Sequence, residues 1–147
     1  MNNLPLKPRK IAWDIINEFT SKNLQLSTIT LKHLENNDKI LNNNDKRFIT
    51  FLIQGTIRFK GRLDLMIDNV YHGTFTKLNP QLQNLLRLGA FQLIYMDNVP
   101  NYAAVTTSVQ LAKKFNQRLA GLTNALLRKL INIEKIKKPT KKSSLNE

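Results

Sequence analysis

The chain of 147 residues has the size of one domain, and 41% of its residues are hydrophobic, which is enough for a core. It contains no cysteine, which excludes disulfides, thiolate nucleophiles and sulfur-ligated metals. Its only two histidines, His33 and His72, are far apart in the sequence. Lys and Arg exceed Asp and Glu by 23 to 10, a net charge of +13 that attracts polyanions, so nucleic acid is the leading class of partner.

Targeting and membrane segments are not recognisable in the sequence. The first ten residues, MNNLPLKPRK, lack the apolar core of a signal peptide. The longest apolar run, residues 85–96, is interrupted by Arg87 and Gln92 and is too short to cross a bilayer. We therefore expect a cytoplasmic protein that does not act at a membrane.

Positive charge is concentrated at the two ends of the chain. Lys7, Arg9 and Lys10 form a basic arm near the N-terminus, and residues 128–142 hold seven basic side chains against Glu134 alone. Such segments can bind RNA phosphates. They can also be solvated runs that aid solubility or contact RNA without specificity, and this alternative remains open.

The first half of the chain has the apolar spacing of helices. Pro8 fits a first helical turn, and the apolar residues after it repeat every three or four positions, which predicts a helix over residues 8–22. Ser27 or Thr28 is the expected cap of a short second helix. Asp45, after an asparagine-rich loop, marks the start of a third helix.

The same spacing continues to the end of the predicted domain. A bend near Lys60-Gly61 separates the third helix from a fourth, and Asn79-Pro80 is a cap with proline at the first helical position, which predicts a helix over residues 79–97. Two more apolar stripes follow, after Pro100 and after Leu119. Because no segment shows sustained period-two alternation, the expected fold is all-α, a bundle of about seven helices.

The folded part is expected to end before the C-terminus. Residues 137–147 contain Pro139 and two serines but almost no apolar side chain. Residues 1–136 are therefore predicted to form one domain, and residues 137–147 a basic tail or linker without fixed structure.

Gly89 interrupts the strong apolar stripe of the predicted 79–97 helix. Glycine in a helix interior costs about 0.5–1 kcal/mol relative to alanine. The expected reason for the glycine is the close approach of a second helix in the core.

No active site is recognisable in the sequence. The five glycines fit neither the Walker spacing nor the GxGxxG pattern, and no serine lies in a nucleophile elbow. Asp64 and Asp68 share one helix face, but basic residues surround them, so a charge-balanced surface is the preferred interpretation. We expect a protein that is not an enzyme and needs neither a cofactor nor a metal.

Three motifs follow one another at a characteristic spacing in the second half. They are VPNYAAV at residues 99–105, SVQLAKK at 108–114 and LTNALLRK at 122–129. Earlier segments agree with them, namely Arg9, Ala12 and Trp13, then Asp45, Arg47 and Phe48, then residues 55–64 and 85–93. Together these motifs resemble the NusB-type RNA-binding domain over residues 7–130.

The resemblance implies an all-α RNA-binding domain, which occurs in two branches. One branch is the free-standing transcription antitermination factor, which binds a boxA RNA element together with a small-subunit ribosomal protein. The other is the N-terminal domain of RsmB-type 16S rRNA cytosine-C5 methyltransferases. The runs GRLD at 61–64, LRLGAFQL at 86–93 and LLRKL at 126–130 are closer to the methyltransferase branch.

This chain lacks what the methyltransferase reaction needs, namely an S-adenosylmethionine-binding fold and a cysteine nucleophile. It is therefore expected to bind RNA, either leader RNA in antitermination or rRNA. The alternative is a protein-interaction module, or a detached N-terminal domain that serves a methyltransferase or binds a ribosomal protein.

The resemblance also implies which basic residues meet RNA. The arm and the start of the first helix are the primary contacts, and the end of the second motif together with the residues directly after it adds further phosphate contacts. The expected RNA-binding residues are Lys7, Arg9, Lys10, Lys113, Lys114 and Arg118. Three other arginines, Arg47, Arg58 and Arg87, are expected to pair with carboxylates or helix ends inside the bundle.

The helix that carries residues 106–110 departs from the family pattern. The family often has Asn-Glu where this sequence has Thr106-Thr107, and Ser108 and Gln110 replace an alanine and an acid, so this helix is less acidic than usual. The change concerns the interface with a ribosomal protein.

Trp13 is expected to pack beside the core face of the first helix and not to stack on a base.

Overall fold

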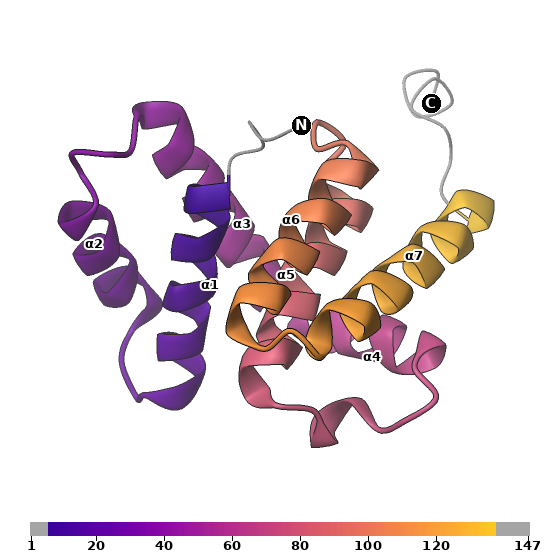
Figure 1. Ribbon diagram of the computed structural model, residues 1–147. Helices are drawn as coiled ribbons and strands as arrows, with labels where there is room; N and C mark the ends of the chain where they lie inside the picture. The colour runs from indigo at the N-terminus through magenta and orange to yellow at the C-terminus, as the bar shows by residue number, and fades with distance from the viewer. Residues whose placement is uncertain (1–5, 138–147) are drawn as a thin grey trace.

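The computed structural model describes residues 6–137, which form seven α-helices and one short 3-10 helix, with no strand among these residues. The helices are α1 (Leu6–Ser21), α2 (Leu26–Asn36), α3 (Asn43–Arg58), α4 (Lys60–Val70), η1 (Phe75–Lys77), α5 (Pro80–Tyr95), α6 (Asn101–Phe115) and α7 (Leu119–Lys137), as Figure 1 shows. The predicted all-α bundle of about seven helices is confirmed. The predicted basic tail lies outside the described residues except for Lys137, so it stays a prediction.

Side-chain caps fix the beginnings of α3 and α5. The amide oxygen of Asn42 accepts a hydrogen bond from the backbone N–H of Asp45 at 2.8 Å, and the Asp45 carboxylate accepts from the N–H of Asn42 at 3.1 Å. This reciprocal pair is a capping box. Asn79 caps α5 through the N–H groups of Gln81 and Leu82. Both predicted starts are confirmed.

The start of α2 differs from the prediction. Its N-cap is Gln25, whose side chain makes no capping hydrogen bond, so the predicted cap at Ser27 or Thr28 is wrong. Leu26 already belongs to the helix, and its carbonyl accepts from the Thr30 hydroxyl at 2.7 Å. The predicted bend near Lys60-Gly61 lies one residue earlier, because Phe59 separates α3 from α4.

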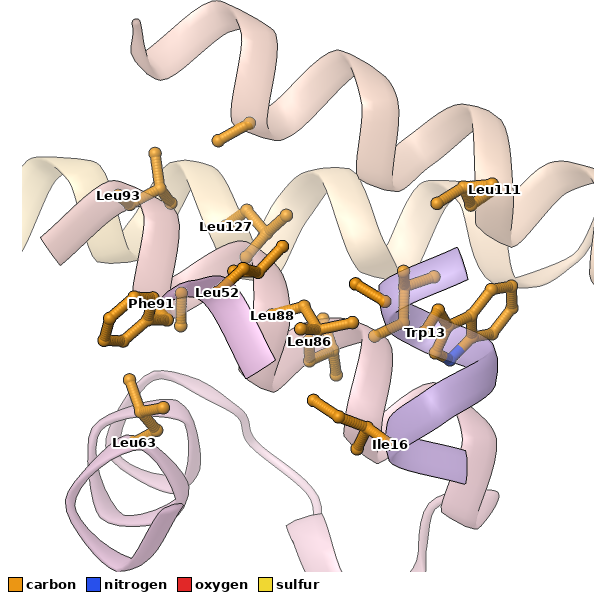
Figure 2. Close-up of a cluster of buried hydrophobic side chains, with 14 of the residues drawn as sticks. Trp13, Ile16, Leu52, Leu63, Leu86, Leu88, Phe91, Leu93, Leu111 and Leu127 are labelled. Atoms are coloured by element: carbon orange, nitrogen blue, oxygen red, sulfur yellow. The ribbon is translucent and has the colours of Figure 1, made fainter. Parts of the chain in front are cut away.

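Helix α5 is the centre of the bundle. Every residue from Asn84 to Ile94 is buried, because α1, α3, α4, α6 and α7 all pack against this helix. Figure 2 shows one continuous cluster that extends from Phe91 to Trp13 through Leu86 and Leu88 of α5. The helices that carry the candidate site are thus held on one central element.

Two glycines let helices approach α5 and α7 closely. A Cβ atom on Gly55 of α3 would lie 2.0 Å from the ring of Phe91, and one on Gly89 would lie 2.9 Å from the hydroxyl of Ser108 and 3.0 Å from Leu127. The close approach predicted at Gly89 is confirmed. The glycine at residue 55 serves the same purpose between α3 and α5.

Gly55→Ala is expected to lower the free energy of unfolding by about 1–3 kcal/mol, because the added methyl group overlaps the Phe91 ring. The gain of about 0.5–1 kcal/mol in helix propensity does not offset this cost. Gly121→Ala is the matched control, since its added Cβ has no neighbour within 4 Å apart from the adjacent residues and backbone of its own helix. Urea unfolding measures both, and a Gly55→Ala protein as stable as the control would show that the close packing is unimportant.

Candidate nucleic-acid interface

Helices α1 and α6 pack against each other and form a shallow depression of about 370 Å³. Lys10, Trp13 and Asp14 of α1 line it together with Lys114 and Phe115 of α6. We call it the α1/α6 depression. It brings together Lys10 and Lys114, which are far apart in the sequence, so no local sequence pattern could show that they meet.

The other exposed cations of the predicted set lie on the same two helices or directly after them. Lys7 lies one helical turn before Lys10 on α1, and Lys113 precedes Lys114 in the last turn of α6. Arg118 lies in the short connection between α6 and α7. All three side chains are exposed, as are those of Lys10 and Lys114. All five can therefore reach RNA phosphates, and Lys10 and Lys114 line the same depression.

An ion pair already occupies one side of the depression. The Lys10 ammonium lies 2.6 Å from the Asp14 carboxylate, and both side chains are partly exposed to solvent, at 46% and 40%. Exposed pairs of this kind contribute only about 0.2–1 kcal/mol. A phosphate can therefore replace Asp14 as the partner of Lys10 at small cost.

An aromatic pair forms the floor and edge of the depression. Trp13 is only 4% exposed, and its indole N–H donates to the carbonyl of Gln81 at 2.8 Å. Its ring meets the edge of Phe115 at a centroid distance of 5.7 Å and an angle of 77°. The prediction that Trp13 packs against the core is confirmed. Phe115, by contrast, is 43% exposed and presents its ring beside Lys114.

Arg9 is placed differently from the expectation that it belongs to an exposed arm. Its side chain is 5% exposed, its Nε donates to the side-chain oxygen of Gln92 at 2.7 Å, and its guanidinium lies 4.8 Å from the ring centre of Phe48. Burial lowers the pKa of Arg9 to about 10, so it stays charged at neutral pH. The expected exposure is wrong, because the helical period places Arg9 on the same face as the buried Ala12 and Trp13.

Of the three arginines predicted to pair inside the bundle, only Arg87 is buried. Arg87 forms a bidentate pair with Asp64, at 2.6 Å and 2.9 Å, and donates to Asn84 at 2.7 Å, which confirms the prediction for this residue. Arg47 and Arg58 are exposed instead. Their place inside the bundle was predicted wrongly, because each lies on the solvent side of α3.

Asp64 and Asp68, which share one face of α4, each have a structural partner. Asp64 lies between Arg87 and Lys60, whose ammonium is 3.6 Å from it. Asp68 accepts a hydrogen bond from the backbone N–H of Phe75 at 3.2 Å. The predicted charge balance is thus confirmed for Asp64, whereas the partner of Asp68 is a neutral backbone N–H.

Comparison with known proteins now identifies the fold. The family model described as the NusB family matches residues 6–132. The chain belongs to the NusB family. The transcription antitermination protein NusB of Clostridium novyi is 26% identical over 111 residues, which are 75% of this chain and 84% of that protein.

Some relatives from the methyltransferase branch match a shorter stretch at higher identity. The probable ribosomal RNA small subunit methyltransferase B of Synechocystis sp. PCC 6803 is 38% identical over 86 residues, which are 58% of this chain. The match covers only 19% of that relative's length. The NusB-type domain is thus the part that this chain shares with the methyltransferases.

Solved structures share the fold. A NusB in a crystal structure of antitermination factors NusB and NusE with double-stranded RNA has a TM-score of 0.79 at 19% identity, and the match covers 90% of this chain and 99% of that one. T. maritima NusB has a TM-score of 0.77 at 16% identity, over 97% and 96% of the two chains.

The structure separates the departures from the family pattern in α6 into two groups. Thr107 and Ser108 are buried, and the Thr107 hydroxyl donates to the carbonyl of Ala103 at 2.6 Å. Only Thr106 and Gln110 are exposed. Of the two positions where the family often has an acid, Thr107 is therefore part of the core, and only Gln110 lowers the acidity of the exposed surface of α6.

Sequence reasoning missed the role of Phe115. Its spacing of four residues from Leu111 suggests a core position, yet it lies in the last turn of α6, where the bundle no longer covers it. None of the helices in the part of the chain that the structure describes is both long enough and apolar enough to cross a membrane.

Proposed function

We propose that this NusB-family chain binds RNA through the α1/α6 depression and the exposed cations around it. The observation that carries the proposal is the convergence of Lys10, Lys114 and the exposed ring of Phe115 from two helices. Lysines bind phosphates as point charges, and an exposed ring offers a stacking surface to an unpaired base. The net charge of +13 favours the same class of ligand.

Regulation of transcription by antitermination is the role that we propose for this binding. Relatives named transcription antitermination protein NusB match along most of their length, and one solved neighbour contains NusB, NusE and RNA. A small-subunit ribosomal protein is accordingly a proposed partner. Because RNA is the ligand, we place the protein in the cytoplasm.

We also propose that the chain acts by binding and not by catalysis. The methyltransferase relatives match it over only 18% to 24% of their own length, within the NusB-type domain. A second candidate function follows from the identities of 38% and 39% to two of them, namely recognition of rRNA on behalf of a separate methyltransferase. Stimulation of such an enzyme by the added chain would favour this second role.

The double variant Lys10→Ala/Lys114→Ala is expected to lower the affinity for a short single-stranded RNA by about tenfold or more, because each lysine loses a charge-assisted phosphate contact. Fluorescence anisotropy of a labelled oligonucleotide measures it. Lys39→Ala/Lys77→Ala is the matched control, since it removes the same charge from exposed residues elsewhere. Equal losses in both variants would mean that only net charge matters and that the proposed interface is wrong.

A further inference from the structure

A second and larger depression, of about 710 Å³, lies where the first turn of α1, the first turns of α3 and the segment between α5 and α6 meet. We call it the α1/α3/α6 groove. Arg9, Arg47, Phe48, Phe51, Asn98 and Tyr102 are among the residues that line it. The first turns of α1 and α6 lie at the upper end of the molecule in Figure 1. The function proposed above uses none of these residues.

Two large rings in the groove are exposed. Phe51 of α3 and Tyr102 of α6 each keep 56% of their surface accessible, although most aromatic rings of the described chain pack in the core. The Phe51 ring is held from behind by Phe91, at a centroid distance of 5.9 Å. Rings fixed in this way can stack on a planar ligand with little loss of side-chain freedom.

The groove also carries positive charge and amide groups. Arg47 is exposed at the start of α3, where its guanidinium donates to the side-chain oxygen of Asn44. Arg9 lies at the buried side of the groove, over the ring of Phe48. The carboxylate of Asp45 is engaged with the backbone of Asn42. The groove therefore combines an exposed cation, aromatic faces and polar amides.

We propose that the α1/α3/α6 groove binds an unpaired nucleotide of single-stranded RNA, with its base stacked on Phe51 or Tyr102 and its phosphate paired with Arg47. This inference rests on the proposed RNA-binding function and extends it. Stacking on aromatic rings and pairing with arginine are the two interactions by which proteins hold unpaired bases and their phosphates. A volume of about 710 Å³ is within the usual range for small-ligand sites.

The position of the groove on α1 supports a nucleic acid over a peptide. Pro8 and Arg9 line the groove, and the next residue, Lys10, lines the α1/α6 depression. Lys7 adds a further exposed cation in the same turn. One strand of RNA can therefore contact both sites across the first turns of α1, with phosphates on the cations between them.

The test compares RNA affinity after loss of the rings. Phe51→Leu and Tyr102→Leu keep apolar bulk but remove the stacking surface, so each is expected to weaken binding of a short single-stranded RNA about fivefold or more. The salt dependence of affinity should stay unchanged, because no charge is removed. Arg47→Gln is expected to weaken binding and to make the salt dependence shallower by about 0.7 in log–log slope. Leu65→Ala, at an exposed residue of α4 outside the groove, is the control.

The outcomes separate this inference from the proposed function. If Lys10→Ala/Lys114→Ala weakens binding while Phe51→Leu and Tyr102→Leu do not, the groove inference is overturned and the proposed function stands. If the wild-type chain binds no oligonucleotide, adenosine monophosphate is titrated directly. Nuclear magnetic resonance shifts at Asn98 and Tyr102 that Arg47→Gln suppresses would support the groove alone. Shifts produced by a glutamate-rich peptide and not by the nucleotide would overturn it in favour of a protein ligand.

Discussion

Replacing Arg87 with methionine is expected to lower the free energy of unfolding by about 3–5 kcal/mol, because one partner of a largely buried ion pair is removed. Arg87 is 6% exposed and donates to Asp64 through two nitrogens. It also donates to the buried Asn84. The substitution leaves these acceptors without their donor in a poorly solvated site, and methionine supplies only apolar contacts.

A double-mutant cycle with Asp64→Asn separates the pair from the rest of the network. The combined Arg87→Met/Asp64→Asn protein is expected to be less destabilised than the sum of the single variants, because the carboxylate that loses its arginine, and keeps only Lys60 at 3.6 Å, is removed as well. Arg47→Met is the control, since Arg47 is exposed and the expected change is within about 0.5 kcal/mol. Urea unfolding that gave Arg87→Met the same stability as this control would refute the structural role.

Trp13→Ala is expected to lower the free energy of unfolding by about 3–5 kcal/mol, because a large buried side chain leaves a cavity. Its removal also breaks the hydrogen bond to the Gln81 carbonyl and the edge contact with Phe115. Trp13→Phe keeps most of the packing and loses the hydrogen bond, so it is expected to cost only about 1 kcal/mol. Thermal and urea unfolding measure both variants.

The control for Trp13 is the exposed ring of Tyr102. Tyr102→Ala is expected to change the free energy of unfolding by less than about 0.5 kcal/mol, because more than half of its surface is exposed. If Trp13→Ala cost no more than Tyr102→Ala, the indole would not be part of the core, and the placement of Phe115 at the depression would lose its support.

Helix positions could be predicted because local signals for them are strong. Asn42 with Asp45, and Asn79 with Pro80, specify helix starts by residue type and spacing. The cap of α2 could not be predicted in the same way, because Gln25 makes no side-chain cap and Ser27 looks like the better candidate. Tertiary packing of Ile29 holds that helix in place instead.

The candidate site could be predicted only in part. Positive charge indicated Lys10 and Lys114 as candidates. That the two lysines line one depression depends on the packing of α1 against α6, two helices that are far apart in the sequence. The charge of Arg9 predicts an exposed side chain, although its helical register predicts a buried one. Its buried partners Gln92 and Phe48 come from other helices and could not be identified from the sequence. The exposed rings were missed for the same reason, since exposure at the end of a bundle is a tertiary property.

The salt dependence of RNA affinity tests the central claim most directly. The four-lysine variant Lys7→Ala/Lys10→Ala/Lys113→Ala/Lys114→Ala is compared with a chain that lacks residues 138–147, which contain three lysines. Arg9 is left intact because it is buried. With about 0.7 lost per phosphate contact on single-stranded RNA, the four-lysine variant is expected to have a log–log slope shallower by about 3, while the shortened chain changes less. A larger change in the shortened chain than in the four-lysine variant would contradict RNA recognition by α1 and α6.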